Sequence, residues 1–360
     1  MSRVYNFAAG PAVLPLEVLQ EAQKELVDYK GAGMSVMEMS HRGKDYDAIH
    51  QEAIATFKEL CGLNDDWAVC FIQGGASLQF AMIPMNFLGA GQTADYANQG
   101  TWSNKALKQA QMIGSVNVVA NCQKDIPTRM PAADEFKWTP GAVYSHVCTN
   151  ETISGAELKE IPDSGSPLIG DMSSDILSCE RDYSKFTMFY AGAQKNLGPS
   201  GMAVVAIRKE FAAKGAQNIP SMLQYRTFVD ENSLYNTPPT WGIYIFGETM
   251  KWVKKMGKEN LFKLNAAKAG KIYDVIDSSD FWTGTALKEF RSNMNVTWRI
   301  KGGDEALEKK FIDEAKALGM SSLKGHRSVG GLRASIYNAF PMEGVDALVS
   351  FMKDFEKKNG

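Results

Sequence analysis

The chain has 360 residues, of which 44% are hydrophobic, and its 39 basic and 41 acidic residues give a formal net charge of -2. A chain of this length can bury a large core and, at roughly 150 residues per domain, is expected to form about two domains. The balanced charge argues against nucleic acid or an acidic membrane surface as a partner.

The sequence shows neither a targeting signal nor a metal-ligand pattern. Its first residues lack the apolar core of a signal peptide, and no stretch approaches the roughly 18 apolar residues of a membrane span, so a cytoplasmic protein is expected. The five cysteines include no CxxC pair, and the four histidines lack the spacing of a metal site. We therefore expect reduced, mostly buried thiols and no bound metal.

The first part of the chain is predicted to be an extended arm followed by two helices. Two prolines and a glycine within residues 1–15 prevent a regular element there. Apolar residues at helical spacing predict helices over 16–29 and 45–60.

Strands and helices then alternate along the chain. Helices over 77–87 and 102–113 are predicted to link the first three strands, and helices that cross over between strands indicate a largely parallel sheet. The fold class is therefore predicted to be α/β. The predicted strands are 67–72, 93–97, 116–120, 142–148, 168–171, 186–190 and 203–207.

The pattern changes after Pro238-Pro239, a pair that neither a helix nor a central strand can contain. We therefore predict an arm (1–15), a large domain (16–257) and a smaller C-terminal α/β domain (258–360). The elements predicted after the proline pair are helices 241–256 and 259–276, strand 294–300, helix 306–318, strand 332–337 and helix 345–357.

Lys195 follows the apolar strand that ends at Tyr190, and it stands among small residues and glycines. The ends of strands are where α/β proteins place their chemistry. Burial lowers the pKa of an ammonium group, and a neutral amine can attack a carbonyl and form a Schiff base. Taken alone, such a segment more often holds an ordinary surface lysine whose ammonium reaches water.

A second candidate site lies at Gly74-Gly75-Ala76-Ser77, where a predicted strand turns into a helix. Glycines let the backbone approach an anion, first-turn N–H groups point at it, and Ser77 adds a hydroxyl, so the turn is typical of a phosphate site. Double glycines also occur in strand–helix turns that bind nothing. The GK[ST] pattern of a P-loop is absent, which argues against nucleoside triphosphates.

Asp171 and Trp102 complete the candidate site. Asp171 ends an apolar strand, where a buried carboxylate favours a cationic partner such as a ring nitrogen, and a turn cap is its alternative role. Trp102 begins a helix after a strand and offers a stacking ring. A phosphate site, a stacking ring, a pyridinium partner and a Schiff-base lysine are the parts that pyridoxal phosphate requires of a protein.

Several short motifs are spread over nearly the whole chain. They are Phe7-Ala8-Ala9-Gly10-Pro11, Ser40-His41-Arg42, Gly74-Gly75-Ala76-Ser77-Leu78-Gln79-Phe80, Asn150-Glu151-Thr152, Gly192-Ala193-Gln194-Lys195-Asn196-Leu197-Gly198-Pro199, Tyr235-Asn236-Thr237-Pro238-Pro239 and Gly325-His326-Arg327-Ser328-Val329-Gly330-Gly331-Leu332-Arg333. With these motifs the chain resembles the phosphoserine aminotransferase family of fold type I pyridoxal-phosphate enzymes. The lysine motif is typical of fold type I enzymes in general, and the arginine-bearing segments narrow the resemblance to this family.

The resemblance implies which residues hold the cofactor, pyridoxal 5'-phosphate. Lys195 would form the Schiff base, Asp171 would pair with the pyridine nitrogen, and Trp102 would stack on the ring. Ala76, Ser77 and Gln194 would bind the cofactor phosphate, and Thr152 would bind the ring hydroxyl.

The resemblance also implies an assembly and a fold. Asn236 and Thr237 would reach the cofactor phosphate of the neighbouring subunit, which implies a homodimer. The large domain would contain a mainly parallel seven-stranded sheet flanked by helices.

The implied reaction is transamination between L-glutamate and 3-phosphohydroxypyruvate, a step of serine biosynthesis, with Lys195 as general base. Arginine forks bind both the carboxylate and the phosphate of such substrates. The resemblance places Arg333 on the α-carboxylate, and it leaves open whether the phosphorylated hydroxythreonine precursor of vitamin B6 is also accepted. The residues placed toward the phosphate or distal carboxylate are His41, Arg42, His326 and Arg327.

Two other functions remain as alternatives. A cysteine desulfurase shares the fold type but needs a reactive cysteine on a mobile loop, and no cysteine lies in a glycine-rich loop. A phosphate-binding module without catalysis would use Lys195 only as an ion-pair partner. One experiment distinguishes the enzymes from the binding module. Either enzyme should be yellow when purified, and borohydride should fix its cofactor covalently to the protein.

Overall fold

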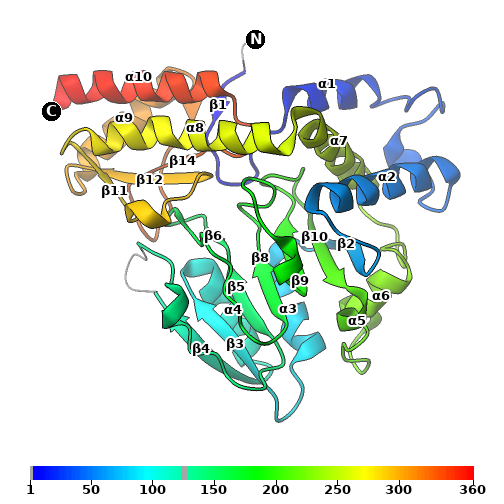
Figure 1. Ribbon diagram of the computed structural model, residues 1–360. Helices are drawn as coiled ribbons and strands as arrows, with labels where there is room; N and C mark the ends of the chain where they lie inside the picture. The colour runs from blue at the N-terminus through cyan, green and yellow to red at the C-terminus, as the bar shows by residue number, and fades with distance from the viewer. Residues whose placement is uncertain (1–2, 123–127) are drawn as a thin grey trace.

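The computed structural model describes residues 3–122 and 128–360, so the first two residues of the predicted arm lie outside the described part. The seven-stranded sheet with its helices is called the large unit, and the three-stranded sheet with α8 (Lys258–Asp277), α9 (Glu305–Ala317) and α10 (Met342–Asn359) is called the smaller unit. Figure 1 shows the smaller unit lying across one end of the large sheet. The large unit holds the predicted α/β sheet.

The central sheet has seven strands in the order β2-β10-β9-β8-β5-β3-β4. β10 is antiparallel to both of its neighbours, and the pairs from β9 to β4 are parallel. The prediction of a mainly parallel seven-stranded sheet is therefore confirmed. The strands are β2 (Trp67–Gln73), β3 (Thr93–Asn98), β4 (Ser115–Asn121), β5 (Ser145–Cys148), β8 (Leu168–Asp171), β9 (Met188–Gly192) and β10 (Met202–Arg208).

Helices cover both faces of this sheet because its strands are apolar on both sides. In β2, Phe71 belongs to one hydrophobic cluster together with Phe246 of α7, whereas the next residue, Ile72, belongs to another with Phe80 of α3. Alternate residues of a strand point to opposite faces, so the two clusters lie on opposite sides of the sheet. The helices of this unit are α2 (Lys44–Cys61), α3 (Gly75–Phe87), α4 (Thr101–Gln111), α5 (Lys209–Ala212), α6 (Tyr225–Asp230) and α7 (Thr240–Met256).

The smaller unit is built on an antiparallel three-stranded sheet in the order β11-β12-β14. Its core includes Trp298 of β12 and Phe311 of α9, which are both fully buried. The elements are α8 (Lys258–Asp277), β11 (Trp282–Gly284), β12 (Asn295–Ile300), α9 (Glu305–Ala317), β13 (Met320–Ser321), β14 (Leu332–Ser335) and α10 (Met342–Asn359).

The N-terminal arm packs against the smaller unit. Its strand β1 (Tyr5–Asn6) pairs in parallel with β13, and Phe7 lies 4.5 Å from Phe340, measured between ring centroids. A two-residue strand has no periodicity that a sequence could reveal, so only the extended conformation was predicted.

Some elements are shorter than predicted or were not predicted. The helix expected over 16–29 ends early, as α1 (Leu16–Lys24), and the following Glu25 accepts a hydrogen bond from the hydroxyl of Tyr244 at 2.6 Å. This contact comes from a distant segment, and the helical spacing of the sequence does not encode it. The elements that were not predicted also include β6 (Asn150–Glu151), β7 (Ala156–Glu157) and the 3-10 helices Val36–Glu38, Ala133–Glu135, Tyr183–Lys185, Ser221–Leu223 and Lys288–Phe290.

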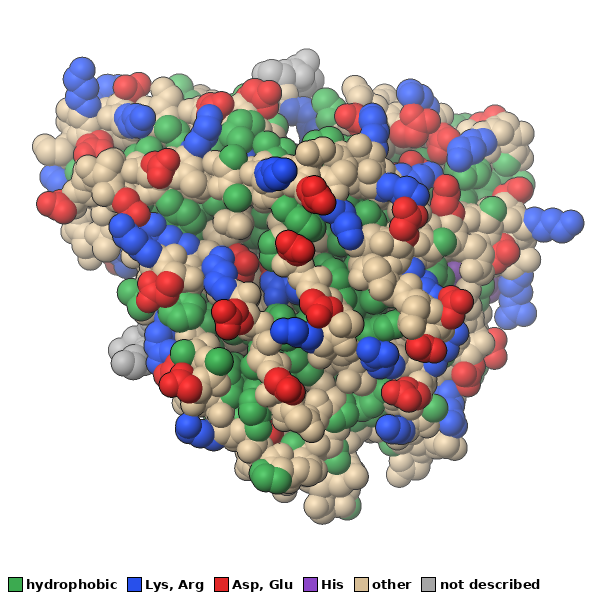
Figure 2. Space-filling view, in the orientation of Figure 1, with side chains coloured by type: hydrophobic (Ala, Val, Ile, Leu, Met, Phe, Trp, Pro, Cys, Tyr) green, Lys and Arg blue, Asp and Glu red, His purple; other side chains and the backbone are tan. Residues whose placement is uncertain are grey.

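The surface carries charges of both signs. On the face shown in Figure 2, acidic and basic side chains are interspersed over both units. Among the described helices, none is long and apolar enough to cross a membrane.

Candidate active site

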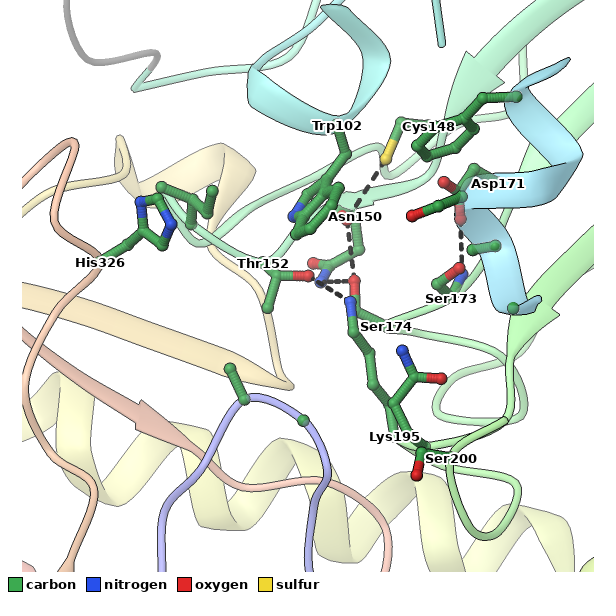
Figure 3. Close-up of a pocket in the computed structure, with 18 of the residues that line it drawn as sticks. Trp102, Cys148, Asn150, Thr152, Asp171, Ser173, Ser174, Lys195, Ser200 and His326 are labelled. Atoms are coloured by element: carbon green, nitrogen blue, oxygen red, sulfur yellow. Dashed lines mark hydrogen bonds between the residues drawn. The ribbon is translucent and has the colours of Figure 1, made fainter. Parts of the chain in front are cut away.

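A cavity of about 530 Å³ opens where the parallel strands end. Asp171 and Cys148 are the last residues of β8 and β5, and both line it. Residues 326 and 333 of the smaller unit line it as well, so both units contribute to the site. Figure 3 shows Asp171 and His326 on opposite sides, with Lys195 and Thr152 between them.

Lys195 lies in the turn that follows β9, and its side chain reaches into this cavity. Its Nζ donates a hydrogen bond to Thr152 Oγ1 at 2.7 Å, and only 9% of the residue is exposed. Burial lowers the pKa of Lys195, while the negative charge of Asp171 opposes the shift. Lys195 is therefore not the surface lysine of the alternative interpretation, but a buried amine held in one position.

Asp171 is buried, and its Oδ1 accepts a hydrogen bond from the backbone N–H of Ser173 at 2.9 Å. Burial raises the pKa of this carboxyl group, and the hydrogen bonds from Ser173 act in the opposite direction. A cation placed in the cavity would reverse this shift, because it stabilises the carboxylate. Asp171 thus presents an acceptor suited to a protonated ring nitrogen.

The glycine turn before α3 is shaped for an anion. Gly74 has a φ of 94°, and no side chain caps the N-terminus of α3. A Cβ at Gly74 would lie 2.9 Å from Leu78 Cδ2, so glycine suits both the backbone angle and the packing. Ala76 and Ser77 of this helix line the cavity together with Gln194, which leaves first-turn N–H groups and polar side chains facing the space.

Trp102 is the second residue of α4 and lines the same cavity. Its Nε1 is buried without a hydrogen-bond partner in the part of the chain that the structure describes. Lys195 Nζ lies 5.7 Å from the centroid of its ring, and Lys105 Nζ lies 4.3 Å away. The indole is therefore positioned beside the buried amine, where it can stack on a flat ligand.

Arg333 and His326 lie at the other side of the cavity, where Arg333 provides positive charge. Arg333 Nη1 donates to the carbonyl oxygen of Thr152 at 3.3 Å, and no carboxylate of the described residues forms an ion pair with it. Burial lowers the pKa of His326, and the nearby charges of Arg333 and Arg327 lower it further. A half-buried arginine without an acidic partner favours an anionic ligand.

These features fit pyridoxal phosphate. Arg333 Nε and Trp102 Nε1 are buried polar atoms that lack a partner among the described residues. The cavity also combines an anion site at the glycine turn, a carboxylate at Asp171 and an amine at Lys195. A phosphorylated aromatic aldehyde with a basic ring nitrogen matches each of these groups.

Several residues that the family resemblance placed at the site do not line this cavity. Asn236 is partly buried, and Thr237, Arg42 and Arg327 are exposed. His41 accepts a hydrogen bond at Nε2 from Arg42 Nε at 3.4 Å, which makes the two side chains one polar group outside the cavity.

The sequence predicted no cofactor- or substrate-binding role for other residues of the cavity, among them Asn150, Ser173, Ser174 and Cys148. Asn150 Nδ2 donates to Ser174 Oγ at 2.8 Å and to Asn295 Oδ1 at 2.9 Å, so it joins the two units behind Thr152. The place of Asn150 in the Asn150-Glu151-Thr152 motif could have indicated that it belongs to the site.

The pKa of the Cys148 thiol is raised by burial, which keeps it protonated and unreactive. Among the described residues, no group of three or more potential metal ligands occurs.

Known proteins resemble this chain from end to end. Residues 4–348 match the family model described as aminotransferase class-V. A phosphoserine aminotransferase of Niallia circulans is 52% identical over 361 residues, with 99% of each chain covered. The solved phosphoserine aminotransferase from Bacillus circulans subsp. alkalophilus has a TM-score of 0.97 and 52% identity, with 99% of each chain covered. The structure of the pyridoxal-phosphate-bound enzyme from Trichomonas vaginalis has a TM-score of 0.94 and 41% identity, with 98% of this chain and 100% of that chain covered.

Proposed function

Because the chain belongs to the class-V aminotransferases, and among them to the phosphoserine aminotransferase family, we propose that it transfers the amino group of L-glutamate to 3-phosphohydroxypyruvate. The products are O-phospho-L-serine and 2-oxoglutarate, and the cofactor is pyridoxal 5'-phosphate. The observation that carries the proposal is the buried Lys195 amine, held by Thr152 in a cavity that also contains Asp171.

We assign the cofactor-holding roles by position in the cavity. Lys195 Nζ would be the covalent attachment point, Asp171 would accept a hydrogen bond from the ring nitrogen, and Trp102 would pack against the ring face. When bound, the cofactor withdraws electrons from the substrate carbon that loses its proton. The remaining polar groups, Thr152 for the ring hydroxyl and Ala76, Ser77 and Gln194 for the phosphate, all line the cavity.

Lys195 would also act as the general base, once the amino group of the donor has replaced Nζ at the cofactor and left it as a free amine. The lowered pKa of Lys195 favours the neutral amine that accepts the α-proton of the amino donor at Nζ. Thr152 Oγ1, at 2.7 Å, holds this nitrogen in place between the substrate and the cavity wall. The amine then returns its proton to the bound substrate, so the lysine is unchanged after the reaction.

Substrate binding is assigned to the cationic side of the cavity. Arg333 binds the α-carboxylate that the donor and the acceptor share, because its half-buried guanidinium lines the cavity without an acidic partner among the described residues. His326 lies beside it and contributes to the second anionic group. We assign Arg327, His41 and Arg42 to the second anionic group of the substrate as well. Because they do not line the cavity of their own chain, they would contact this group from its rim or from a second copy of the chain.

We further propose a homodimer in which Asn236 and Thr237 complete the neighbouring subunit's phosphate site. Large hydrophobic side chains are exposed near these residues and near Arg42, as an interface would require: Tyr235 is 48% exposed and Met37 is 54% exposed. A second copy that covers these segments would bring their polar residues toward a cavity that they do not line in one chain.

Complementation between subunits tests the dimer. Lys195→Ala and Asn236→Ala are each expected to be inactive or strongly impaired. A refolded equal mixture of the two should regain about a quarter of the wild-type activity, since half of the dimers would be mixed and each would contain one complete site. If the mixture stays as inactive as its components, Asn236 acts within its own subunit or has no role in the site.

Spectroscopy and kinetics test the enzyme itself. Purified protein should be yellow, and borohydride should fix the cofactor to the peptide that contains Lys195. Lys195→Ala should bind the cofactor without turnover, whereas Lys271→Ala, which changes an exposed lysine on α8, should leave turnover intact. If the purified protein gains no colour when pyridoxal phosphate is added, the proposed function as a pyridoxal-phosphate enzyme is wrong. Rates with 3-phosphohydroxypyruvate and with the phosphorylated hydroxythreonine precursor decide between the two acceptors.

The division into domains is also a proposal, with boundaries at 15 and 257. Separate hydrophobic clusters support it, because the buried apolar residues of α7 belong to two clusters of the large unit, whereas most of those of α8 belong to the cluster of the smaller unit. Limited proteolysis should cut first near Gly257, between these helices. Early cleavage inside the seven-stranded sheet would contradict the division.

A further inference from the structure

Helix α4, which positions Trp102, begins at a residue that cannot cap it. The residue before its first turn is Gly100, and glycine offers no side-chain acceptor for the unpaired N–H groups of a helix start. The second and third residues of the helix, Trp102 and Ser103, are the ones whose N–H groups an N-cap side chain usually satisfies.

A glutamate from a distant segment takes the place of the missing cap. Glu151 Oε1 accepts hydrogen bonds from the backbone N–H of Trp102 at 3.0 Å and from that of Ser103 at 3.3 Å. Glu151 is 48 residues away from Ser103 in the chain and is completely buried. Burial raises the pKa of Glu151 to about 7, and the hydrogen bonds from Ser103 and Trp102 act in the opposite direction. In its ionised form the carboxylate also interacts favourably with the positive end of the helix dipole.

Gly100 and Glu151 fit together. A Cβ built on Gly100 would lie 2.5 Å from Glu151 Cδ, a distance that real side chains do not adopt. The backbone of Gly100 is extended, with a φ of 166°, so the glycine is needed here for space rather than for an unusual angle. The absence of a side chain at the cap position is thus what admits the carboxylate.

The contact between Glu151 and α4 connects two residues of the proposed cofactor site, Thr152 and Trp102. Glu151 lies directly before Thr152 in the β6–β7 hairpin, and Thr152 Oγ1 accepts the hydrogen bond from Lys195 Nζ. Trp102 lies in the first turn of the helix that Glu151 caps. One buried carboxylate therefore links the stacking ring to the residue that holds the catalytic amine.

We propose that Glu151 is a positioning residue that fixes Trp102 and Thr152 relative to each other and so sets the geometry of the cofactor ring. It does not line the cavity, so it acts through these two neighbours rather than on the substrate. The effect of Glu151 on catalysis rests on the proposed function, whereas the capping of α4 by Glu151 does not depend on a bound cofactor.

Hydrogen exchange of the cofactor-free protein tests the capping. In Glu151→Ala, the amides of Trp102 and Ser103 should exchange roughly fivefold faster or more, because a lost N-cap weakens a helix start by that order. Glu151→Gln keeps a side-chain oxygen at the same position and should retain most of the protection. Gly100→Ala displaces the carboxylate without removing it and should resemble Glu151→Ala.

Glu157→Ala is the matched control. Glu157 is a buried glutamate in the same hairpin, and its Oε2 accepts from the backbone N–H of Asn293 rather than from α4. The Glu157→Ala variant should weaken the packing of the hairpin while leaving the hydrogen exchange of the α4 amides unchanged. Equal exchange in wild type and Glu151→Ala, or equal acceleration in Glu157→Ala, would overturn the proposal.

The reconstituted enzyme provides the functional arm. Glu151→Ala should lower kcat roughly tenfold, the loss typical of a disturbed supporting residue, with KM for both substrates nearly unchanged, and it should shift the visible dichroism of the bound cofactor. Glu151→Gln should recover most of kcat. A rise in KM without a change in kcat or dichroism would refute the positioning role. If wild-type protein bound no cofactor, the proposed function would fail, while the exchange experiment would still decide the capping.

Discussion

The stability of this fold in acid should depend on His146. This histidine lies in β5, is 1% exposed, and stacks on Tyr96 with ring centroids 4.9 Å apart. Its Nε2 lies 2.9 Å from the hydroxyl oxygen of Tyr190, and its Nδ1 is buried with no partner within the described residues. Burial lowers the pKa of His146 to about 3, so the folded protein keeps the ring neutral.

The sign of the effect follows from proton uptake. Above the unfolded pKa of about 6.5, neither state binds a proton at His146, and the residue makes no contribution to pH dependence. As the pH falls below this value, His146 is protonated in the unfolded chain but stays neutral in the folded protein. The free energy of unfolding therefore decreases progressively down to about pH 3. At about 1.4 kcal/mol per pH unit, the loss between pH 6.5 and pH 5 is about 2 kcal/mol.

Urea unfolding of wild type and His146→Gln measures this loss. Glutamine cannot be protonated but can still hydrogen-bond to Tyr190, so the variant should lack this loss even if its stability at pH 8 is lower. Between about pH 8 and pH 5, wild type should lose about 2 kcal/mol more than the variant. His41→Gln, at a half-exposed surface position, is the control and should follow wild type. Equal losses in wild type and His146→Gln would refute the reasoning.

Four further variants test the site and the packing. Asp171→Asn should retain the cofactor but lower kcat by about 10³-fold, as determined by steady-state kinetics, because an amide does not stabilise a protonated ring nitrogen. Arg333→Gln should raise KM for both amino donor and keto acceptor by roughly 30-fold, since a charged hydrogen bond contributes about 2 kcal/mol, and an effect on one substrate only would contradict the shared α-carboxylate role. Gly155→Ala should cost about 2 kcal/mol or more of unfolding free energy in urea, because Gly155 has a φ of 74° and a Cβ would lie 2.5 Å from the carbonyl oxygen of Asn295. Phe311→Ala should cost about 4 kcal/mol in the same assay by emptying the core of the smaller unit.

The sequence allowed the sheet and the centre of the site to be predicted because both depend on local patterns. Strand β8 occupies the predicted residues 168–171, since a short continuous apolar run is typical of a buried parallel strand. Asp171 and Lys195 could be placed at strand ends for the same reason, and the carboxyl ends of parallel strands meet at one edge of a sheet. The neighbours of Lys195 in the chain favoured a surface lysine, so its prediction as the Schiff-base amine also needed Asp171, the glycine turn, Trp102 and the family resemblance.

The β6–β7 hairpin could not be predicted because long-range contacts hold it. Its strands have two residues each, too few to show alternation. Asn150 binds Asn295, 145 residues away, and Thr297 Oγ1 donates to the carbonyl oxygen of Ser154 at 2.6 Å. The role of Glu151 was invisible for the same reason, since a carboxylate that caps a helix from a distant segment has no spacing that identifies it.

The motif residues that lie away from the cavity add a separate argument about assembly. Arg42 and Thr237 are exposed in one chain, although the family resemblance assigns both to the site. An exposed side chain close to exposed apolar neighbours such as Met37 and Tyr235 has two explanations, a surface without function or an interface. The first predicts that Arg42→Gln leaves KM for 3-phosphohydroxypyruvate unchanged. The second predicts a rise in KM that disappears for unphosphorylated keto acids and depends on the protein remaining a dimer, because the guanidinium would then belong to the neighbouring subunit's site.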